Sequence, residues 1–121
     1  MKRGFHKSWG AEIVDGGTRF RLWAPAQDRL ALRCDGTDHP MDPDGSGWFE
    51  ATLPGVGDGH DYGFVLDSGQ VVPDPAARAQ AGDVHGLSRV VDPKAFDWSP
   101  WTGRAWEEAV ILEVHIGTFT P

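Results

Sequence analysis

Two pairs of neighbouring acidic residues are the first candidates for catalytic chemistry in this sequence. Asp42 and Asp44 flank a proline in a turn-rich stretch, and Glu107 and Glu108 follow one another near the C-terminus. Two carboxyl groups can work as general acid and general base when burial raises the pKa of one of them. Neither pair has the apolar surroundings that would raise a pKa. Both pairs are therefore interpreted as solvated surface charges.

Five histidines and one cysteine are the candidate metal ligands. The histidines are scattered without the spacing that is typical of a metal site: His6, His39, His60, His85 and His115. The sequence therefore predicts no metal site, and no cofactor is expected. Cys34 is alone, so it cannot form a disulfide within the chain. A lone cysteine fits a reducing compartment, and the predicted location is cytoplasmic.

The charge balance argues against two large classes of partner. The chain has 11 basic and 18 acidic residues, a formal net charge of −7. Nucleic-acid binding relies on clustered Lys and Arg side chains, and an anionic membrane surface would repel this chain. No stretch approaches the ~20 apolar residues of a membrane span, and the basic N-terminus lacks the apolar core of a signal peptide. Neither nucleic acid nor a membrane is therefore an expected partner.

The elements that would position these residues are short strands separated by turns. Strict alternation marks the clearest of them, where Phe20 and Leu22 share one face and Arg19 and Arg21 the other. The expected strands cover residues 11–14, 18–23, 30–34, 37–41, 48–53, 61–66 and 70–72. About seven short antiparallel strands spaced by turns predict an all-β, immunoglobulin-like sandwich over residues 1–73.

The rest of the chain differs in character from the sandwich. Residues 74–109 are punctuated by prolines, the pattern of an irregular strap that runs along a domain surface. Trp98, Trp101 and Trp106 are expected to anchor this strap against the sandwich or against the catalytic domain that follows. Residues 110–121 begin with a nearly continuous aliphatic run, which predicts a strand buried on both faces. Such a strand needs covering layers, so it is expected to be the first strand of a further domain.

Three stretches of the chain resemble one enzyme family. Residues 20–25 resemble the signature, ending in Trp-Ala-Pro, that opens the N-terminal domain of α-amylase-superfamily enzymes acting on α-1,6 branches or trehalose. Residues 73–92 resemble the segment that follows this domain, with P-D-P-x-x-R and then V-H-G-x-S-x-V-V-D. Residues 98–121 resemble the entry into the (β/α)8 catalytic barrel and end in E-x-H-I-G-T-F-T-P. In combination they are most similar to the malto-oligosyltrehalose trehalohydrolases of glycoside hydrolase family 13, which carry an isoamylase-type, CBM48-like N-terminal domain.

The resemblance implies that the catalytic residues are not among these 121. Enzymes of this superfamily retain anomeric configuration through two carboxylates about 5 Å apart. The nucleophilic Asp, the acid/base Glu and a third Asp follow later barrel strands, beyond Pro121. We therefore expect a non-catalytic N-terminal domain that braces its own catalytic barrel. The parent enzyme would release trehalose from maltooligosyl trehalose, a step of trehalose biosynthesis and carbohydrate metabolism.

The resemblance also allows the sugar-binding positions to be compared. Related glycogen-binding modules stack sugars on tryptophans, since a sugar ring has an apolar face, and hold a hydroxyl with a lysine. The matching positions lie within residues 33–37, at Gly63 and near Val71 or Val72, so the aromatic residues and the lysine are missing. Trp48 is the remaining candidate for a sugar platform. A structural brace is preferred over a glucan binder.

Two alternatives stay open beside the trehalohydrolase interpretation. In the first alternative, the chain is an autonomous glucan-binding CBM48 module. In the second, it is the equivalent domain of a glycogen branching or debranching enzyme. The expected partners are the catalytic barrel and, weakly, a maltooligosaccharide or glucan. Without the barrel, Val110–Phe119 is expected to be disordered, to pair with the sandwich edge or to pair with another copy of the chain.

Overall fold

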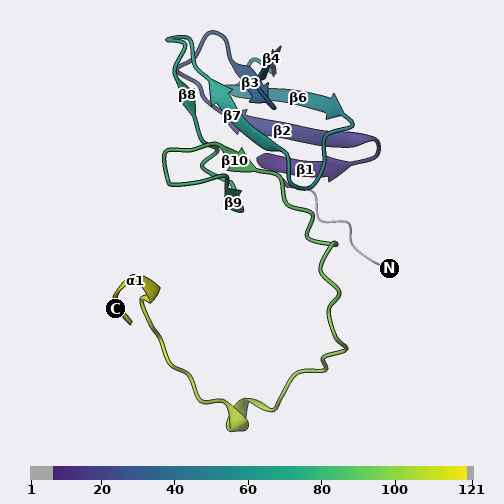
Figure 1. Ribbon diagram of the computed structural model, residues 1–121, viewed down its shortest axis with the longest axis vertical. Coiled ribbons are helices and arrows are strands. Elements are labelled where there is room, and N and C mark those ends of the chain that lie inside the picture. The colour runs from purple at the N-terminus through teal and green to yellow at the C-terminus, as the bar shows by residue number, and fades with distance from the viewer. Residues whose placement is uncertain (1–6, 120–121) are drawn as a thin grey trace.

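The computed structural model describes residues 7–119, and two antiparallel β-sheets make up its folded part (Figure 1). Predictions that concern residues 1–6 and 120–121, His6 among them, lie outside the described residues. Sheet A contains, in spatial order, β1 (Gly10–Val14), β2 (Gly17–Trp23), β6 (Trp48–Pro54) and β5 (Asp42–Pro43). Sheet B contains β4 (Thr37–Pro40), β3 (Ala31–Cys34), β7 (Asp61–Val65), β10 (Ser88–Arg89) and β9 (Ala79–Gln80), with β8 (Val71–Val72) also paired to β7. The predicted all-β sandwich is confirmed.

The hydrophobic alternation of the strands decides which residues enter the core. In the β2–β6 pair, Phe20 lies opposite Ala51 and Leu22 opposite Phe49 on the inner face of sheet A. Sheet B contributes three of the largest buried side chains, Leu32, Tyr62 and Phe64. The ring of Tyr62 lies 4.8 Å from that of Phe20 and 6.1 Å from that of Phe64, measured between centroids. Tyr62 therefore joins the two sheets at the centre of the core.

The turn between β3 and β4 follows from its sequence. Asp35 and Gly36 have φ angles of 48° and 82°, so both are in the left-handed region. A two-residue hairpin loop of this kind needs two positive φ angles, which glycine and aspartate tolerate best. The Asp-Gly pair thus sets the register in which Cys34 faces Thr37.

The sheet continues beyond the expected domain boundary at residue 73. Strands β9 and β10 both belong to sheet B, and Ser88 of β10 pairs with Tyr62 of β7. Ser88 and Val90 are buried, and Asp74 is only 4% exposed. The first half of the expected strap, up to Val90, is therefore an integral part of the sandwich.

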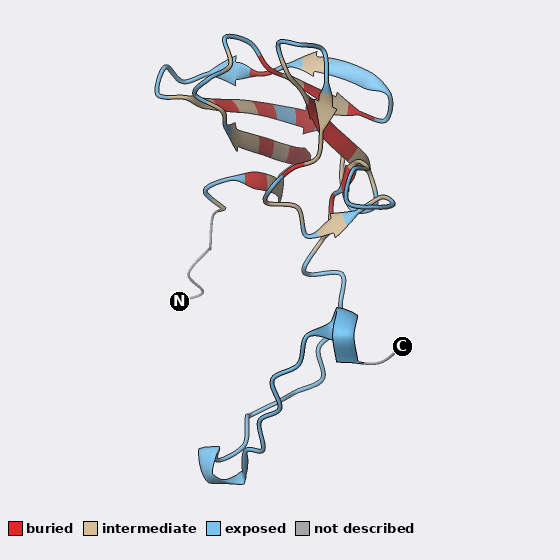
Figure 2. Cartoon of the chain, turned by 90° about the vertical axis from the view of Figure 1, so that its left-hand side faces the viewer, coloured by how far each residue is buried: buried red, intermediate tan, exposed pale blue. Residues whose placement is uncertain are grey.

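The second half of the expected strap does not pack on the sandwich. All residues from 93 to 119 are exposed, and Figure 2 shows this tail as a continuous exposed segment that extends below the sandwich. Trp98, Trp101 and Trp106 are each at least 75% exposed, so they do not anchor the strap on the sandwich, and their packing on the catalytic barrel stays a prediction. Trp98 contacts Phe96 instead, with ring centroids 4.6 Å apart.

The strand expected over residues 110–119 is not formed. Residues 110–115 have no regular structure, and α1 (Ile116–Phe119) is a single helical turn. The other helical element of the tail is the 3-10 turn η1 (Trp106–Glu108). A strand needs a neighbour for its backbone N–H and C=O groups, and within residues 7–119 no strand pairs with this segment. Within the same residues, no helix is long and apolar enough to cross a membrane.

Candidate functional site

Asp42 and Asp44 lie at the exposed edge of sheet A. Asp44 accepts hydrogen bonds from the backbone N–H and the hydroxyl of Ser46, both at 2.8 Å, and from the backbone N–H of Trp48 at 3.3 Å. The bonds from Ser46, more than the one from Trp48, hold the pKa of this carboxyl below its ordinary range. A carboxyl that stays ionised cannot serve as a general acid. Asp44 is therefore the acceptor that closes the turn before β6, and Asp42 is an exposed residue of β5.

Glu107 and Glu108 are exposed on the turn η1. A carboxylate oxygen of Glu108 lies 2.7 Å from the guanidinium of Arg104, four residues earlier. Ion pairs with this spacing on an exposed turn contribute little to stability. Both acidic pairs are thus exposed surface charges, as the sequence indicated.

Four of the five histidines, and Cys34, lie within the described residues. Within residues 7–119, no group of three or more His, Cys, Asp or Glu side chains is arranged to hold a metal ion. The ring of His60 lies 3.7 Å from Asp35, His85 is exposed, and the ring of His115 faces Thr118. Cys34 is buried, and its burial raises the pKa of the thiol to about 11. Such a thiol remains protonated and unreactive.

The position that matches the lysine of related glycogen-binding modules is closed in this structure. Gly63 is buried in β7, and a Cβ atom added there would lie 2.8 Å from Cδ2 of Leu87 and 3.1 Å from Cγ1 of Val71. Leu87 belongs to the segment between β9 and β10, which covers this part of sheet B. No longer side chain at this position can reach a sugar while Leu87 stays in place.

Trp48 lies at the start of β6 on the outer face of sheet A, where the sequence could not reveal its neighbours. The guanidinium of Arg21 lies 4.4 Å from the centroid of its ring, and Trp9 lies 6.0 Å away, centroid to centroid. Trp23 of β2 is the direct cross-strand partner of Trp48. The sequence would have placed Trp23 opposite Trp48 if β2 and β6 had been recognised as paired strands. No pattern in the sequence indicated that Trp9 lies close to Trp48.

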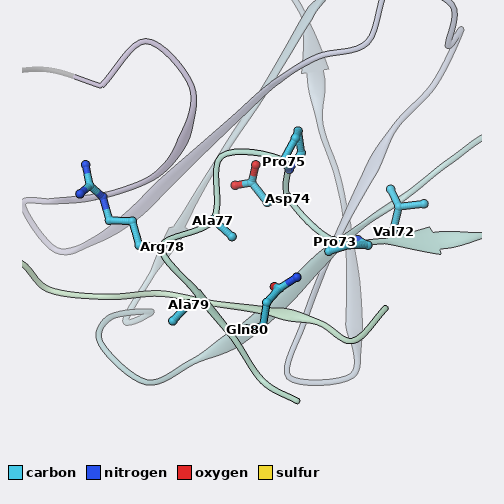
Figure 3. A pocket seen from close by; sticks show the side chains of 8 residues that line it. All are labelled: Val72, Pro73, Asp74, Pro75, Ala77, Arg78, Ala79 and Gln80. Carbon is cyan, nitrogen blue, oxygen red and sulfur yellow. The ribbon is translucent and has the colours of Figure 1, made fainter. Parts of the chain in front are cut away.

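A buried carboxylate, which the sequence analysis missed, fixes the segment after β8 to the sandwich. The hydroxyl of Tyr62 donates to Asp74 at 2.6 Å, and the backbone N–H of Ala76 donates to the same carboxylate at 2.8 Å. The backbone N–H of Asp74 donates to the Ser88 hydroxyl, which in turn donates to Gln80. Figure 3 shows Asp74 within the curve of the loop that lines an open hollow next to β8. This network joins β7, the Pro-Asp-Pro loop and β10.

Burial dominates the ionisation of Asp74. It raises the pKa of the carboxyl, although the hydrogen bonds from Tyr62 and Ala76 oppose the change. The pKa of the Tyr62 hydroxyl is also raised, first by burial and then by the charge of Asp74. The folded protein therefore favours the protonated form of Asp74 more than the unfolded chain does.

We expect Asp74→Asn to change how stability depends on pH. Since the pKa of Asp74 is higher in the folded protein, the free energy of unfolding falls as pH rises from the ordinary carboxyl pKa through the raised one. An amide never ionises, and the Tyr62 hydroxyl can accept its N–H. Wild type should therefore gain stability relative to Asp74→Asn as the pH is lowered.

The measurement is the urea midpoint of both proteins between about pH 3 and pH 7, the range in which carboxyl groups titrate. Asp38→Asn is the matched control with the opposite sign, because the hydrogen bond from Arg33 lowers the pKa of Asp38. Wild type should lose stability relative to that variant as the pH falls. A difference between wild type and Asp74→Asn that is constant with pH would show that the carboxyl is not perturbed.

Comparisons with known proteins place this architecture in a family. Residues 6–95 match carbohydrate-binding module 48, described as the isoamylase N-terminal domain. The chain is 49% identical to malto-oligosyltrehalose trehalohydrolase of Deinococcus radiodurans over 93% of its own length and 19% of that protein. It is 36% identical to a 1,4-α-glucan branching enzyme of Burkholderia lata, over 77% of this chain and 14% of that one.

Among solved structures, a putative α-amylase from Salmonella typhimurium matches with a TM-score of 0.88 and 52% identity, covering 97% of this chain and 20% of the other. The chain thus spans about a fifth of the length of the trehalohydrolase and of this α-amylase. The matched region contains both sheets and the Asp74 network. The chain belongs to the carbohydrate-binding module 48 family, the N-terminal domain of isoamylase-type enzymes.

Proposed function

We propose that the chain is a non-catalytic module of a glycoside hydrolase that releases trehalose from maltooligosyl trehalose, in trehalose biosynthesis. The observation that carries the non-catalytic assignment is the exposure of both carboxylate pairs, in which Asp44 closes a turn and Glu108 pairs with Arg104. Retaining hydrolysis needs two carboxyl groups about 5 Å apart across a bound sugar, one of them with a raised pKa. The similarity to trehalohydrolases supports the choice of substrate.

An assay of the isolated chain tests this proposal. Purified chain, free of host enzymes, is incubated with maltooligosyl trehalose, and free trehalose is measured over time. We expect no release above the heat-denatured control. Release that rises in proportion to the concentration of folded chain would overturn the non-catalytic assignment.

The exposed tail supports a bracing role. It carries a dense set of exposed apolar side chains, namely Phe96, Trp98, Trp101, Trp106, Val110, Ile111, Leu112, Ile116 and Phe119. Soluble proteins rarely leave so many large apolar groups in water, and such segments mark protein contacts. We infer that the tail packs on the catalytic barrel of the same enzyme, and that in the isolated chain it contacts another copy.

Sedimentation velocity tests the contact between copies. We expect the isolated chain to associate as its concentration rises, and Ile111→Asp with Leu112→Asp to remove this association because both side chains are over 70% exposed. A wild-type chain that remains monomeric at all concentrations, with a mobile tail by NMR, would rule out pairing between copies.

Two other functions remain candidates on specific observations. The similarity to a branching enzyme favours the same bracing role in an enzyme that builds or removes α-1,6 branches. Identification of the catalytic domain joined to this module distinguishes it from the trehalohydrolase. The family's description favours an autonomous glucan-binding module, but the closed position at Gly63 argues against binding there.

The proposed location is the cytoplasm. The support comes from Cys34, whose thiol is free, buried and held protonated by its environment. Free cysteines persist most readily in reducing compartments. Fractionation of cells that express the parent enzyme with its own leader sequence, if it has one, tests the location directly; recovery outside the cytoplasm would contradict it.

A further inference from the structure

One arginine of the module has no acidic partner. Within residues 7–119, six arginines form ion pairs with carboxylates, namely Arg19, Arg21, Arg29, Arg33, Arg89 and Arg104. Arg78, the arginine of the Pro-Asp-Pro-x-x-Arg motif, forms no ion pair with these residues and is exposed. The chain has 18 acidic and 11 basic residues, so the missing pair does not come from a shortage of carboxylates.

Arg78 shares a hollow with a second cation. Lys7 and Arg78 both line an open hollow of about 240 Å³, together with Trp9. Among the described residues Lys7 also forms no ion pair with a carboxylate, and residues 1–6 contain no Asp or Glu that could supply one. We call Lys7 and Arg78 the cation pair.

The two members of the cation pair repel one another. Burial first, and then the charge of Arg78, lower the pKa of the Lys7 ammonium, although Glu12 and Asp74 oppose the change. Glu12 is engaged by Arg19, and the buried carboxyl of Asp74 has a raised pKa. The net effect still disfavours the charged ammonium, so an anion between the two cations would relieve a cost that the module alone does not remove.

Lys7 is held in place before a partner arrives. Its ammonium donates to the backbone carbonyl of Ala11 at 2.7 Å, and its own backbone carbonyl accepts from the guanidinium of Arg19 at 2.8 Å. An ammonium has three N–H donors, so two remain for an acceptor in the hollow. A donor that is already fixed loses little conformational entropy on binding, which favours a stable contact.

The loop that carries Arg78 is fixed as well. Asp74 joins this loop to the Tyr62 hydroxyl, and a Cβ atom added at Gly10 of β1 would lie 3.1 Å from the Cβ of Ala76. The loop thus contacts both sheets. Figure 3 shows the Arg78 side chain directed away from Asp74. Its guanidinium is therefore presented outward on a rigid support.

The position of the cation pair points to the catalytic domain as the source of the anion. Val91, close to the end of the folded part, lines a small hollow together with Lys7 and Arg78. From residue 93 onward the chain is exposed, and Figure 1 shows it leaving the sandwich from the end of β10. Because the family is an N-terminal domain, the catalytic domain of the proposed enzyme follows this tail. The tail therefore leaves the sandwich beside the cation pair.

We propose that the cation pair is a docking site for a carboxylate side chain, Asp or Glu, of the catalytic domain of the same enzyme. This inference rests on the proposed bracing role and adds a polar contact to the apolar ones of the tail. A carboxylate bound by both cations removes their repulsion. Trp9, which is 58% exposed, forms a wall of the hollow against which the methylene groups of a glutamate can pack.

The first test is carbodiimide crosslinking of the full-length enzyme that contains this chain. The reagent activates a carboxyl group, which then forms an amide with an amino group in contact with it, while the reagent takes up the water that is lost. We expect mass spectrometry to identify Lys7 joined to an Asp or Glu of the catalytic domain. Failure to find that product, or crosslinks of Lys7 only within this module or to a second copy of the enzyme, would contradict the proposal.

The second test compares Arg78→Gln in the full-length enzyme and in the isolated chain. In the enzyme, loss of one charged partner at the interface should lower the midpoint of thermal inactivation by about 2–4 °C. In the isolated chain the same change relieves the repulsion of Lys7, so the urea midpoint should stay unchanged or rise. Arg33→Gln is the matched control: its partner Asp38 lies within the module, so it should change both midpoints in the same direction.

The outcomes separate this inference from the bracing role on which it rests. If deletion of the whole module leaves the inactivation midpoint of the enzyme unchanged, the bracing role has failed and the docking site with it. If deletion lowers the midpoint but Arg78→Gln does not, the bracing role stands and the docking site is wrong. Inorganic phosphate that raises the midpoint of the full-length enzyme, but not that of its Arg78→Gln variant, would show that a free anion occupies the site and would also overturn the proposal.

Discussion

Tyr62→Ala is expected to lower the free energy of unfolding by about 3–5 kcal/mol, the usual cost of removing a large aromatic side chain from a core. Tyr62 is 1% exposed and lies between Phe20 and Phe64, so the neighbouring side chains cannot close the cavity without moving both sheets. Its loss also removes the hydroxyl that donates to the buried Asp74. The substitution therefore combines a cavity with the loss of one of the two hydrogen bonds that the Asp74 carboxylate accepts from Tyr62 and Ala76.

Urea unfolding followed by far-UV circular dichroism measures this effect, with Tyr62→Phe as the matched control. The control keeps the ring and removes only the hydroxyl, so it should cost about 1–3 kcal/mol, the penalty of leaving a buried acceptor unsatisfied. A cost for Tyr62→Ala no larger than that for Tyr62→Phe would show that the ring does not join the sheets as described.

Gly63→Lys is expected to lower the free energy of unfolding by about 1–3 kcal/mol, the usual cost of forcing extra atoms into a packed site. The new Cβ would meet Cδ2 of Leu87 at 2.8 Å and the backbone carbonyl oxygen of Val72 at 3.1 Å. The lysine must therefore displace the Leu87 side chain and crowd the backbone of β8. Restoring the family residue at this position should damage the fold instead of creating a sugar site.

A double-mutant cycle with Leu87→Ala measures this clash. In the Gly63→Lys background, removing the leucine side chain should restore part of the lost free energy of unfolding. The double variant should therefore be more stable than the sum of the two single effects predicts. Gly82→Lys is the matched control, since a Cβ at Gly82 has no atom within 4 Å. If Gly63→Lys lowered the free energy of unfolding no more than Gly82→Lys does, the conclusion that Leu87 covers Gly63 would be refuted.

The strands of the sandwich could be predicted because their signals are local. Alternation places Phe20 and Leu22 on one face of β2, and the Asp35-Gly36 pair tolerates the positive φ angles of its hairpin. These signals depend on a few adjacent residues, so the bounds of β2 and β6 agree with the sequence to within one residue.

The contacts of the site could not be predicted because they join residues far apart in the chain. Nothing in the residues around Gly63 indicates that Leu87 covers it, and nothing near Asp74 indicates its bond to Tyr62. The contact between Trp9 and Trp48 has the same origin, since the two rings meet only after β1, β2 and β6 have paired. Residues 110–115 form no strand here for a related reason: an apolar run specifies a strand only where another strand pairs with it, so the barrel strand expected over residues 110–121 stays a prediction.

The central claim is that this module braces a catalytic domain without taking part in the chemistry, and one comparison tests it most directly. Three proteins are needed: the Deinococcus radiodurans trehalohydrolase, the same enzyme with its matched region replaced by this chain, and the enzyme without that region. Trehalose release and the midpoint of thermal inactivation are measured for each.

We predict that the chimera keeps both the activity and the inactivation midpoint of the intact enzyme. The deletion should inactivate at a temperature lower by about 5 °C or more, since each kcal/mol lost lowers the midpoint by about 2–4 °C in a domain of 150–250 residues. An enzyme that lacks the region yet matches the intact protein in both activity and thermal resistance would contradict the bracing role.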